Sequence, residues 1–229
     1  MNLTKVIQKI LGKPDFSLSN DVPLSYILEK ATIVARGLLK GVFVKYKIKG
    51  SKKKLFVGRQ VKLKDKKKIE FGDSVRIESG TIIDALSTEG VILGDRVKIG
   101  EDSRILCSGS LKKLGRGLVI GNDSSFSENT FFGAAGGIKI GNDVIAGQNV
   151  RFHSENHNFS DLNELIRNQG VTNKGITIGD NCWIGSGVVF LDGAHVPEGC
   201  VIGANSVVNG VFEKNSIIVG SPAKSIKKR

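Results

Sequence analysis

The sequence has few of the residues that build disulfide-stapled folds or large aromatic cores. Only 4 of its 229 residues are proline and 3 are cysteine, and aromatic residues make up 6%. Three cysteines cannot form a paired disulfide framework, so a reducing compartment is the default. With 40% hydrophobic and 24% charged residues, the composition excludes a disordered or collagen-like chain. The length fits one domain with a short extension.

The sequence also lacks a secretory or membrane-spanning pattern. The first twelve residues contain Lys5 and Lys9 and no unbroken apolar run, unlike a signal peptide. The most apolar stretch, 22–44, is interrupted by charged residues that argue against a span; these are Glu29, Lys30, Arg36 and Lys40. We therefore expect a cytoplasmic protein.

Positive charge is abundant, and it is concentrated in the first third of the chain. The formal net charge is +12, yet residues 1–68 hold 18 Lys and Arg against 4 Asp and Glu, whereas residues 69–229 hold 16 against 18. The densest segments are 52–54 and 62–68. A solvated basic face and peripheral contact with an anionic membrane surface both explain this charge. Nucleic acid is not an expected partner, because no aromatic interleaving or binding motif accompanies the charge.

An apolar stripe with helical spacing precedes this basic segment. Its members are Ile27, Leu28, Ala31, Val34, Ala35, Leu38 and Leu39. This spacing predicts an amphipathic helix, and Gly41 is expected to end it. We expect the stripe to pack against the domain or a partner subunit, or alternatively to lie at a membrane interface.

From about residue 57 an apolar residue recurs every six positions. The cleanest run is Ile178, Ile184, Phe190, Val196, Ile202 and Val208, and shorter runs precede it. Three short strands joined by tight turns would close one triangular coil, with permissive turn residues such as Gly141 and Asn142. Stacked coils pair as parallel strands and together bury a core. The pattern predicts an all-β coil over 57–229, preceded by a basic segment with a short helix over 1–56.

Cys182 and Cys200 lie one coil apart in this arrangement. Both are expected to be stacked on one inner corner as small buried fillers. We predict that both remain free thiols.

Two motifs carry a resemblance to a known family. The segments Asn181-Cys182-Trp183-Ile184-Gly185-Ser186 and Val219-Gly220-Ser221-Pro222-Ala223-Lys224, together with the six-residue repeat, resemble the hexapeptide-repeat acyltransferases. Residues from about 57 to 229 are covered. Within that family the chain is similar to the O-acetyltransferases of surface polysaccharide synthesis. The resemblance implies a left-handed parallel β-helix, a homotrimer, acetyl-CoA as donor, a saccharide acceptor and no metal.

The repeat breaks after Phe152 and resumes at Ile176 or Ile178, leaving an inserted loop over 153–175. A long excursion from a solenoid is usually functional. The resemblance implies that this loop carries the catalytic histidine in an Asn-His context, which Asn156 and His157 match. An imidazole suits the removal of a hydroxyl proton near pH 7. His153 is the alternative base, and Glu155 is a candidate for orienting the imidazole.

Other site residues are implied by the same resemblance. Asn129 and Trp183 are expected at the acceptor, although Trp183 also suits packing between subunits. The expected wall for the pantetheine arm consists of Gly185, Ser186, Gly203 and Ala204. Lys224 is expected to reach a phosphate of the donor, unless it only keeps the C-terminal tail soluble. The site is expected in a cleft between two subunits.

The leading hypothesis is an acetyl-CoA-dependent O-acetyltransferase that modifies a saccharide hydroxyl in surface polysaccharide biosynthesis. One alternative is N-acetylation of a nucleotide-linked amino sugar, and another is a non-catalytic scaffold for glycan assembly. A zinc site of His153, His157 and His195, as in carbonic anhydrase relatives, is not expected because the spacing does not match.

Overall fold

A computed structural model describes residues 8, 17–19, 21–50 and 54–229, so Lys52 and Lys53 of the basic segment lie outside the described residues. The chain divides into two compact units, Met1–Arg36 and Gly37–Arg229. The division falls within helix α2 (Leu24–Val44), whereas the sequence places the start of the coil at residue 57. The coil in fact begins with strands at residues 49 and 55.

Helix α2 runs past Gly41 to Val44, so the prediction that Gly41 ends the helix is wrong. Gly37 and Gly41 are the buried residues of α2, and each faces the first coil. A Cβ on Gly37 would overlap the ring of Phe56, and one on Gly41 would overlap the carbonyl of Leu55. The two glycines therefore allow α2 to lie close against the first coil, because only residues without a side chain fit there. They do not end the helix.

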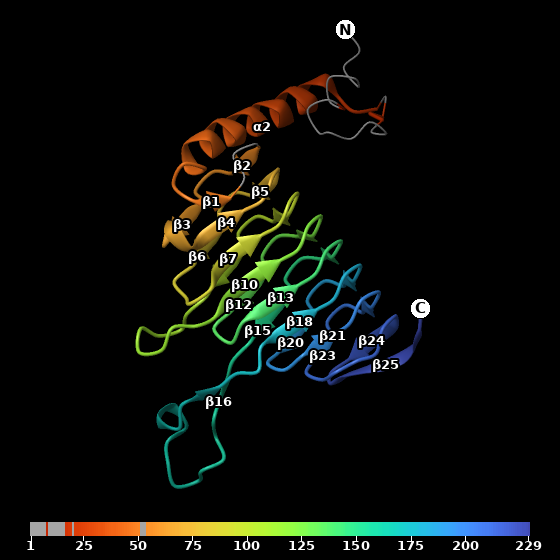
Figure 1. Cartoon of the computed structure of the whole chain (residues 1–229). Helices are drawn as coiled ribbons and strands as arrows, with labels where there is room; N and C mark the ends of the chain where they lie inside the picture. The colour runs from red at the N-terminus through yellow and green to blue at the C-terminus, as the bar shows by residue number, and fades with distance from the viewer. Residues whose placement is uncertain (1–7, 9–16, 20, 51–53) are drawn as a thin grey trace. The chain divides into compact units, whose positions relative to one another are not determined.

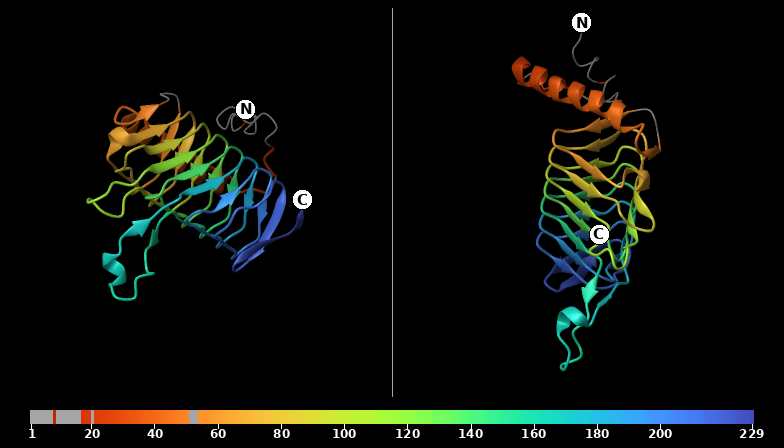
Figure 2. Two further views of the ribbon diagram at one scale, coloured as in Figure 1. Left: turned by 60° about the horizontal axis from the view of Figure 1, so that its bottom comes forward. Right: turned by 90° about the vertical axis from the view of Figure 1, so that its left-hand side faces the viewer.

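The second unit contains a three-sided coil whose strands form three long sheets, and the expected left-handed parallel β-helix is confirmed (Figures 1 and 2). The first sheet, sheet A, is β1 (Lys49–Gly50), β4 (Ile69–Phe71), β7 (Gly90–Leu93), β10 (Gly117–Ile120), β13 (Ile138–Ile140), β18 (Ile176–Ile178) and β21 (His195–Val196). Sheet B is β2 (Leu55–Val57), β5 (Val75–Ile77), β8 (Lys98–Ile99), β11 (Ser125–Phe126), β14 (Ile145–Ala146), β19 (Trp183–Ile184), β22 (Val201–Ile202), β24 (Ser216–Gly220) and β25 (Ala223–Lys228). Sheet C is β3 (Lys62–Lys64), β6 (Ile82–Asp84), β9 (Arg104–Leu106), β12 (Phe131–Gly133), β15 (Arg151–His153), β20 (Val189–Leu191) and β23 (Val207–Val208).

Strands within each sheet pair in parallel, except that β25 runs antiparallel to β24 at the C-terminal end. Because the chain visits sheets A, B and C in turn, the coil has an A–B, a B–C and a C–A corner. A 3-10 turn, η1 (Lys66–Lys68), lies at the C–A corner of the first coil. Among the described helices, none is both long and apolar enough to cross a bilayer.

The six-residue repeat points its apolar residues into the coil, as predicted. Every leading residue of the run from Ile178 to Val208 is buried. The rings of Phe132, Phe152 and Phe190 stack in successive coils with centroids 5.1 and 4.8 Å apart. Phe126 meets Phe132 edge to face at 5.1 Å. These rings form a continuous aromatic stack inside the core.

The cysteine prediction is confirmed. Cys182 and Cys200 are free and buried, as is Cys107. The Cys200 carbonyl accepts the backbone N–H of Trp183 at 2.9 Å, which places Cys200 directly below the strand that Cys182 precedes. Burial raises the pKa of the Cys182 thiol to about 11. The thiol is therefore an inert filler at neutral pH.

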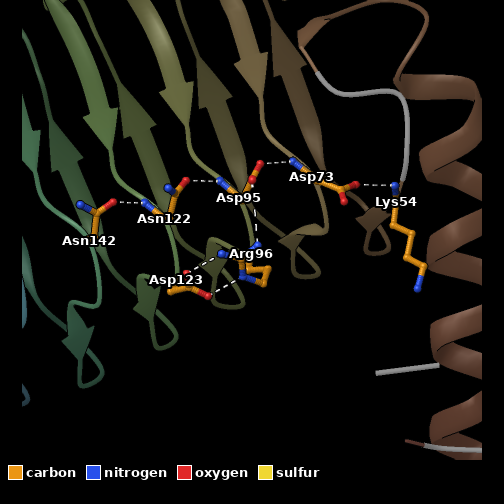
Figure 3. Close-up of polar contacts among 7 residues, drawn as sticks. All are labelled: Lys54, Asp73, Asp95, Arg96, Asn122, Asp123 and Asn142. Atoms are coloured by element: carbon orange, nitrogen blue, oxygen red, sulfur yellow. Dashed lines mark hydrogen bonds and ion pairs between the residues drawn. The ribbon is translucent and has the colours of Figure 1, made fainter. Parts of the chain in front are cut away.

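A ladder of side-chain acceptors follows the A–B corner (Figure 3). The backbone N–H of Lys54 donates to Asp73 Oδ1 at 3.0 Å, and that of Asp73 donates to Asp95 Oδ1 at 2.7 Å. In the same way, the backbone N–H of Asp95 donates to Asn122 Oδ1 and that of Asn122 donates to Asn142 Oδ1, each at 2.8 Å. Each coil thus satisfies a turn donor of the previous coil, which would otherwise lack a partner.

The recurrent glycine before each acceptor has a steric cause. A Cβ on Gly94 would lie 2.5 Å from Asn122 Oδ1, and one on Gly121 would lie 2.7 Å from Asn142 Oδ1. Beside the ladder, Arg96 binds both carboxylate oxygens of Asp123, at 2.5 and 2.6 Å (Figure 3). The repeated Gly-Asp and Gly-Asn pairs are therefore explained by coil stacking.

The C–A corner carries the excursions of the coil. A loop over 107–116 joins β9 to β10, and a longer arm over 154–175 joins β15 to β18 (Figures 1 and 2). The arm agrees with the predicted insertion over 153–175, except that His153 still belongs to β15. The shorter loop was not expected from the sequence.

Candidate functional site

Both ends of the arm are anchored to the coil by hydrogen bonds. At the outgoing end, Ser154 is buried; its hydroxyl donates to the Gly133 carbonyl at 2.8 Å and accepts the Gly136 N–H at 2.9 Å. At the returning end, Asp192 Oδ1 accepts the N–H groups of Lys174 and Gly175, each at 2.8 Å. The base of the arm therefore has a defined position on the C–A corner.

Polar contacts within the arm hold its outer part together. Strand β16 (Asn156–His157) pairs antiparallel with β17 (Val171–Thr172). The turn η2 (Ile166–Asn168) lies between them. The side chain of Gln169 donates to the carbonyls of Asp161 and Glu164, both at 2.8 Å. The arm is thus a compact loop of the kind that often carries functional residues.

The candidate base His157 lies on this arm and is exposed. It is opposite Val171 in the short antiparallel pair. A hollow of about 450 Å³ adjoins it, lined by Asn156, His157, Asn158, Phe159, Ser160 and Thr172. An exposed imidazole beside a hollow is accessible to an incoming hydroxyl, which is the first requirement for a general base.

The alternative base His153 has a different environment. It ends β15 on sheet C, and its ring lies 5.4 Å from that of Phe131. Burial, followed by the charge of Arg151, lowers the pKa of His153. Contact with an aromatic ring is a packing role, but a neutral imidazole also retains a lone pair that can accept a proton. The two histidines are therefore distinguished by substitution below.

Asn129 occupies a turn at the B–C corner, between β11 and β12. Its φ is 58°, in the left-handed region that asparagine tolerates better than most residues. Asn149 and Asn205 adopt the same conformation at turns of other coils. Asn129 borders a hollow of about 400 Å³, lined also by Gly80, Ile82, Asp102, Arg104, Thr130 and Phe131. Turn geometry alone explains why an asparagine occupies this position. Only the hollow beside Asn129 indicates that it could also contact a ligand.

The residues expected to hold the donor gather on sheet B and its B–C corner. Trp183 lies between Ile145 and Val201 in register, and 56% of its surface is exposed. Ser186 and Ala204 occupy the corner in successive coils, since the N–H of Asn205 donates to the Ser186 carbonyl at 2.9 Å. The Ser186 hydroxyl also donates to Gln148 Oε1 at 2.9 Å.

Gly185 and Gly203 leave room for the coil that follows each of them. A Cβ on Gly185 would lie 2.6 Å from the backbone nitrogen of Ala204, and one on Gly203 would lie 2.8 Å from Val219 Cγ1. These glycines are thus required by stacking. They also keep the partly exposed corner narrow and free of large side chains, as an extended pantetheine arm would need.

Lys224 lies on β25 at the C-terminal end of sheet B, paired with Val219, and it is exposed. A hollow of about 500 Å³ adjoins it. Lys224 therefore belongs to the same side of the coil as the expected donor wall.

The arm and the donor wall occupy different corners of one chain. Asn129, Ser186 and Ala204 lie at the B–C corner, whereas the arm with His157 leaves from the C–A corner. His157 and Asn129 each border a hollow, and the two hollows have no lining residue in common. The predicted residues are therefore brought together only in two separate groups.

Asp192 is a residue that the sequence analysis missed, and its replacement should loosen the arm. Asp192→Ala removes the acceptor of two backbone N–H groups. We expect faster proteolysis within 154–175 and a loss of about 1 kcal/mol in the free energy of unfolding. Limited proteolysis and urea denaturation measure these effects. Asp192→Asn keeps one carbonyl oxygen and is the matched control; equal cleavage of Asp192→Ala and wild type would contradict the anchoring role.

Ser154, like Asp192, was not predicted from the sequence. No pattern in the sequence marks either residue as an anchor, so each looks like an ordinary strand or turn residue. Their roles depend on contacts with Gly136 and Gly175, which only the folded coil brings near. Within the part of the chain that is described, no three His, Cys, Asp or Glu side chains are grouped as metal ligands would be.

Comparison with known proteins assigns the coil to a family. Residues 175–210 match the family described as "Bacterial transferase hexapeptide (six repeats)". The chain is 32% identical over 137 residues to a probable acetyltransferase of Mycobacterium tuberculosis, Rv3034c, covering 60% of this chain and 44% of that protein. It is 29% identical over 126 residues to the Escherichia coli putative lipopolysaccharide biosynthesis O-acetyl transferase WbbJ, covering 52% and 64%. The matched segments thus span about half of these relatives.

Among solved structures, AntD of Bacillus cereus has a similar fold. AntD is an N-acyltransferase crystallised with dTDP and 3-hydroxybutyryl-CoA. The TM-score is 0.53 at 16% identity, covering 83% of this chain and 88% of AntD. The chain thus carries the hexapeptide repeat of bacterial transferases over residues 175–210 and is similar to proteins named as acetyltransferases.

Proposed function

We propose that the protein is an acetyl-CoA-dependent O-acetyltransferase that modifies a saccharide hydroxyl in surface polysaccharide biosynthesis. The observation that carries the proposal is the anchored arm, which presents Asn156 and His157 at the single long excursion predicted from the repeat. The match to the hexapeptide repeat and the relatives named as acetyltransferases, WbbJ among them, support it. The three free thiols suit a reducing compartment, so we place the reaction in the cytoplasm.

The proposed chemistry is a direct transfer. The imidazole of His157 accepts the proton of the sugar hydroxyl while the hydroxyl oxygen bonds to the thioester carbonyl carbon. The carbon–sulfur bond then breaks, and the imidazolium returns the proton to the departing CoA sulfur. The products are an acetyl ester and free CoA thiol, and no acyl-enzyme is needed.

The donor is assigned to the side of the coil that carries small residues. Gly185, Ser186, Gly203 and Ala204 would line the pantetheine arm, because larger side chains would fill that narrow corner. Lys224 would contact a phosphate of the donor. Trp183 and Asn129 would border the acceptor, since both are exposed, Trp183 on the strand that leads to this wall and Asn129 at the same B–C corner.

A homotrimer would bring the two groups of residues together. The arm exposes four large apolar side chains: Phe159 (71%), Leu162 (96%), Leu165 (58%) and Ile166 (56%). Exposed apolar residues on a projecting arm are typical of a surface that a partner covers. If the arm of one subunit lies against the B–C corner of the next, His157 meets the donor wall in a cleft between subunits.

The test is acetyl transfer to a panel of sugars, nucleotide sugars and lipid-linked acceptors. We expect thiol release from acetyl-CoA that depends on one class of acceptor, and a product whose acetyl group is removed by mild alkali. If acetyl-CoA neither raises the melting temperature nor releases thiol with any acceptor, a non-catalytic scaffold is favoured instead.

A second candidate is N-acetylation of a nucleotide-linked amino sugar. The fold of the N-acyltransferase AntD, which covers most of this chain, favours including it. The same assay separates the two reactions, because an amide survives the mild alkali that cleaves an ester. An alkali-stable product would replace the O-acetyl assignment.

A further inference from the structure

The C-terminal part of α2 and the turn that follows it present an apolar surface that nothing in the described chain covers. Leu39, Val42, Phe43 and Tyr46 are exposed at 64%, 44%, 72% and 72%. Leu39, Val42 and Phe43 lie on one helical face because they are spaced by three and four residues, and Tyr46 lies in the turn that follows Val44. We call these four residues the end patch. Of the predicted stripe, Leu38 and Leu39 belong to the second unit; Leu38 is half-buried and Leu39 is exposed.

The end patch points away from the coil. Gly37 and Gly41 face the first coil, as their contacts with Phe56 and Leu55 show. Leu39 follows Gly37 by two residues, which is about 200° around a helix of 3.6 residues per turn. Lys40 donates to the Gly58 carbonyl at 2.8 Å and ties the helix to the coil from its flank. The patch is therefore the outward surface of this end.

Basic side chains surround the same end on all three sides. Strands β1, β2 and β3 are the first strands of sheets A, B and C in the described chain. Exposed lysines lie on or beside each of them: Lys49, Lys54, Lys62, Lys64, Lys66, Lys67 and Lys68. Because coils are about 4.8 Å apart, these first-coil lysines lie close to the end surface. From residue 37 to 68 the sequence holds 13 Lys and Arg and one acidic residue, Asp65.

We propose that this end of the coil, consisting of the end patch and the first-coil lysines, docks on an anionic phospholipid surface. Apolar side chains would enter the interfacial layer, while long lysine side chains reach the headgroups around them. A single partner, the anionic bilayer, would thus contact both the end patch and the first-coil lysines. Docking would hold the coil upright, with β19 and β22 of the proposed donor wall five and six strands away from β2 and the docked end.

Charge favours a lipid surface over a second copy of this chain. A face-to-face contact between two such ends would bring together two sets of lysines with Asp65 as the only acidic residue among residues 37–68. Like charges at close range oppose that contact, whereas an anionic surface attracts each lysine. The helix lies on the membrane in this arrangement, because its charged residues oppose insertion across it.

The experiment is co-sedimentation of the full chain with phosphatidylcholine vesicles, with and without phosphatidylglycerol. We expect binding to the anionic vesicles only, and weaker binding as the salt concentration rises. The variant Lys62→Gln/Lys66→Gln/Lys67→Gln should bind roughly a hundredfold more weakly, at about fivefold per lysine. The variant Leu39→Ser/Phe43→Ser should lose about tenfold or more.

Matched controls remove the same chemistry elsewhere. Lys112→Gln/Lys113→Gln/Lys227→Gln loses three charges outside the first coil, and Leu111→Ser/Leu114→Ser loses two exposed apolar side chains of the 107–116 loop; both should bind as wild type. Equal binding to neutral vesicles, no sedimentation with anionic vesicles, or equal losses in test and control variants would overturn the proposal. So would a Leu39→Ser/Phe43→Ser protein that changes oligomeric state in light scattering but keeps full vesicle binding. Because the assay contains neither donor nor acceptor, its outcome is independent of the proposed acetyl transfer.

Discussion

Replacing His157 by alanine is expected to lower kcat for acetyl transfer by about 10²- to 10⁴-fold, the usual contribution of a general base. The loss should appear mainly in kcat, because the proposed contacts with the donor come from sheet B and its corner. Thiol release from acetyl-CoA with an accepted sugar measures the effect. Added imidazole should restore part of the rate if only the base is missing.

Two other histidines serve as controls for this prediction. His195 lies exposed on β21, opposite Thr177 of the coil and not on the arm itself, so His195→Ala should keep wild-type turnover. His153 packs beside Phe131, so His153→Ala should change stability more than kcat. If His157→Ala retained full turnover while His153→Ala lost it, the base would be His153.

The largest loss of stability is expected from Phe152→Ala. Phe152 is fully buried between Phe132 and Phe190, with ring centroids 5.1 and 4.8 Å away. Removing the ring leaves a cavity in a parallel stack that cannot collapse sideways, so the free energy of unfolding should fall by about 3–5 kcal/mol. Urea denaturation followed by circular dichroism measures it. Because the arm leaves the coil two residues later, proteolysis of the arm should also accelerate.

The control for this prediction is a phenylalanine outside the core. Phe43 is 72% exposed on α2, and Phe43→Ala should change the free energy of unfolding by no more than about 0.5 kcal/mol. Similar losses for the two variants would mean that the phenylalanine stack does not dominate the stability of the coil.

Local regularities could be predicted from the sequence because every coil repeats the same geometry. An apolar residue six positions after another one must point inward, so Ile178, Ile184 and Phe190 are identified without coordinates. The spacing of Cys182 and Cys200 placed them in adjacent coils by the same reasoning. The break after Phe152 located the arm, since a chain that leaves the coil loses the period.

Features that depend on contacts between distant residues could not be predicted. Gly41 looks like a helix stop in the sequence, yet α2 continues past it to Val44. A glycine is needed at this position because a Cβ there would overlap the carbonyl of Leu55. The anchoring of the arm depends on Asp192, which follows the arm by a whole coil. The buried positions of α2 are Gly37 and Gly41, which an apolar pattern does not mark because glycine has no side chain.

The parallel coil, its core and the position of its long arm could be read from the order of residues, because a repeat period and its interruption are properties of that order. That His157 and the small residues of the B–C corner belong to different corners, and that the basic first coil carries an outward apolar patch, became evident only from the folded chain. Those relations arise from the turning of the coil and the packing of α2 on it, which bring together or separate residues irrespective of their distance in sequence.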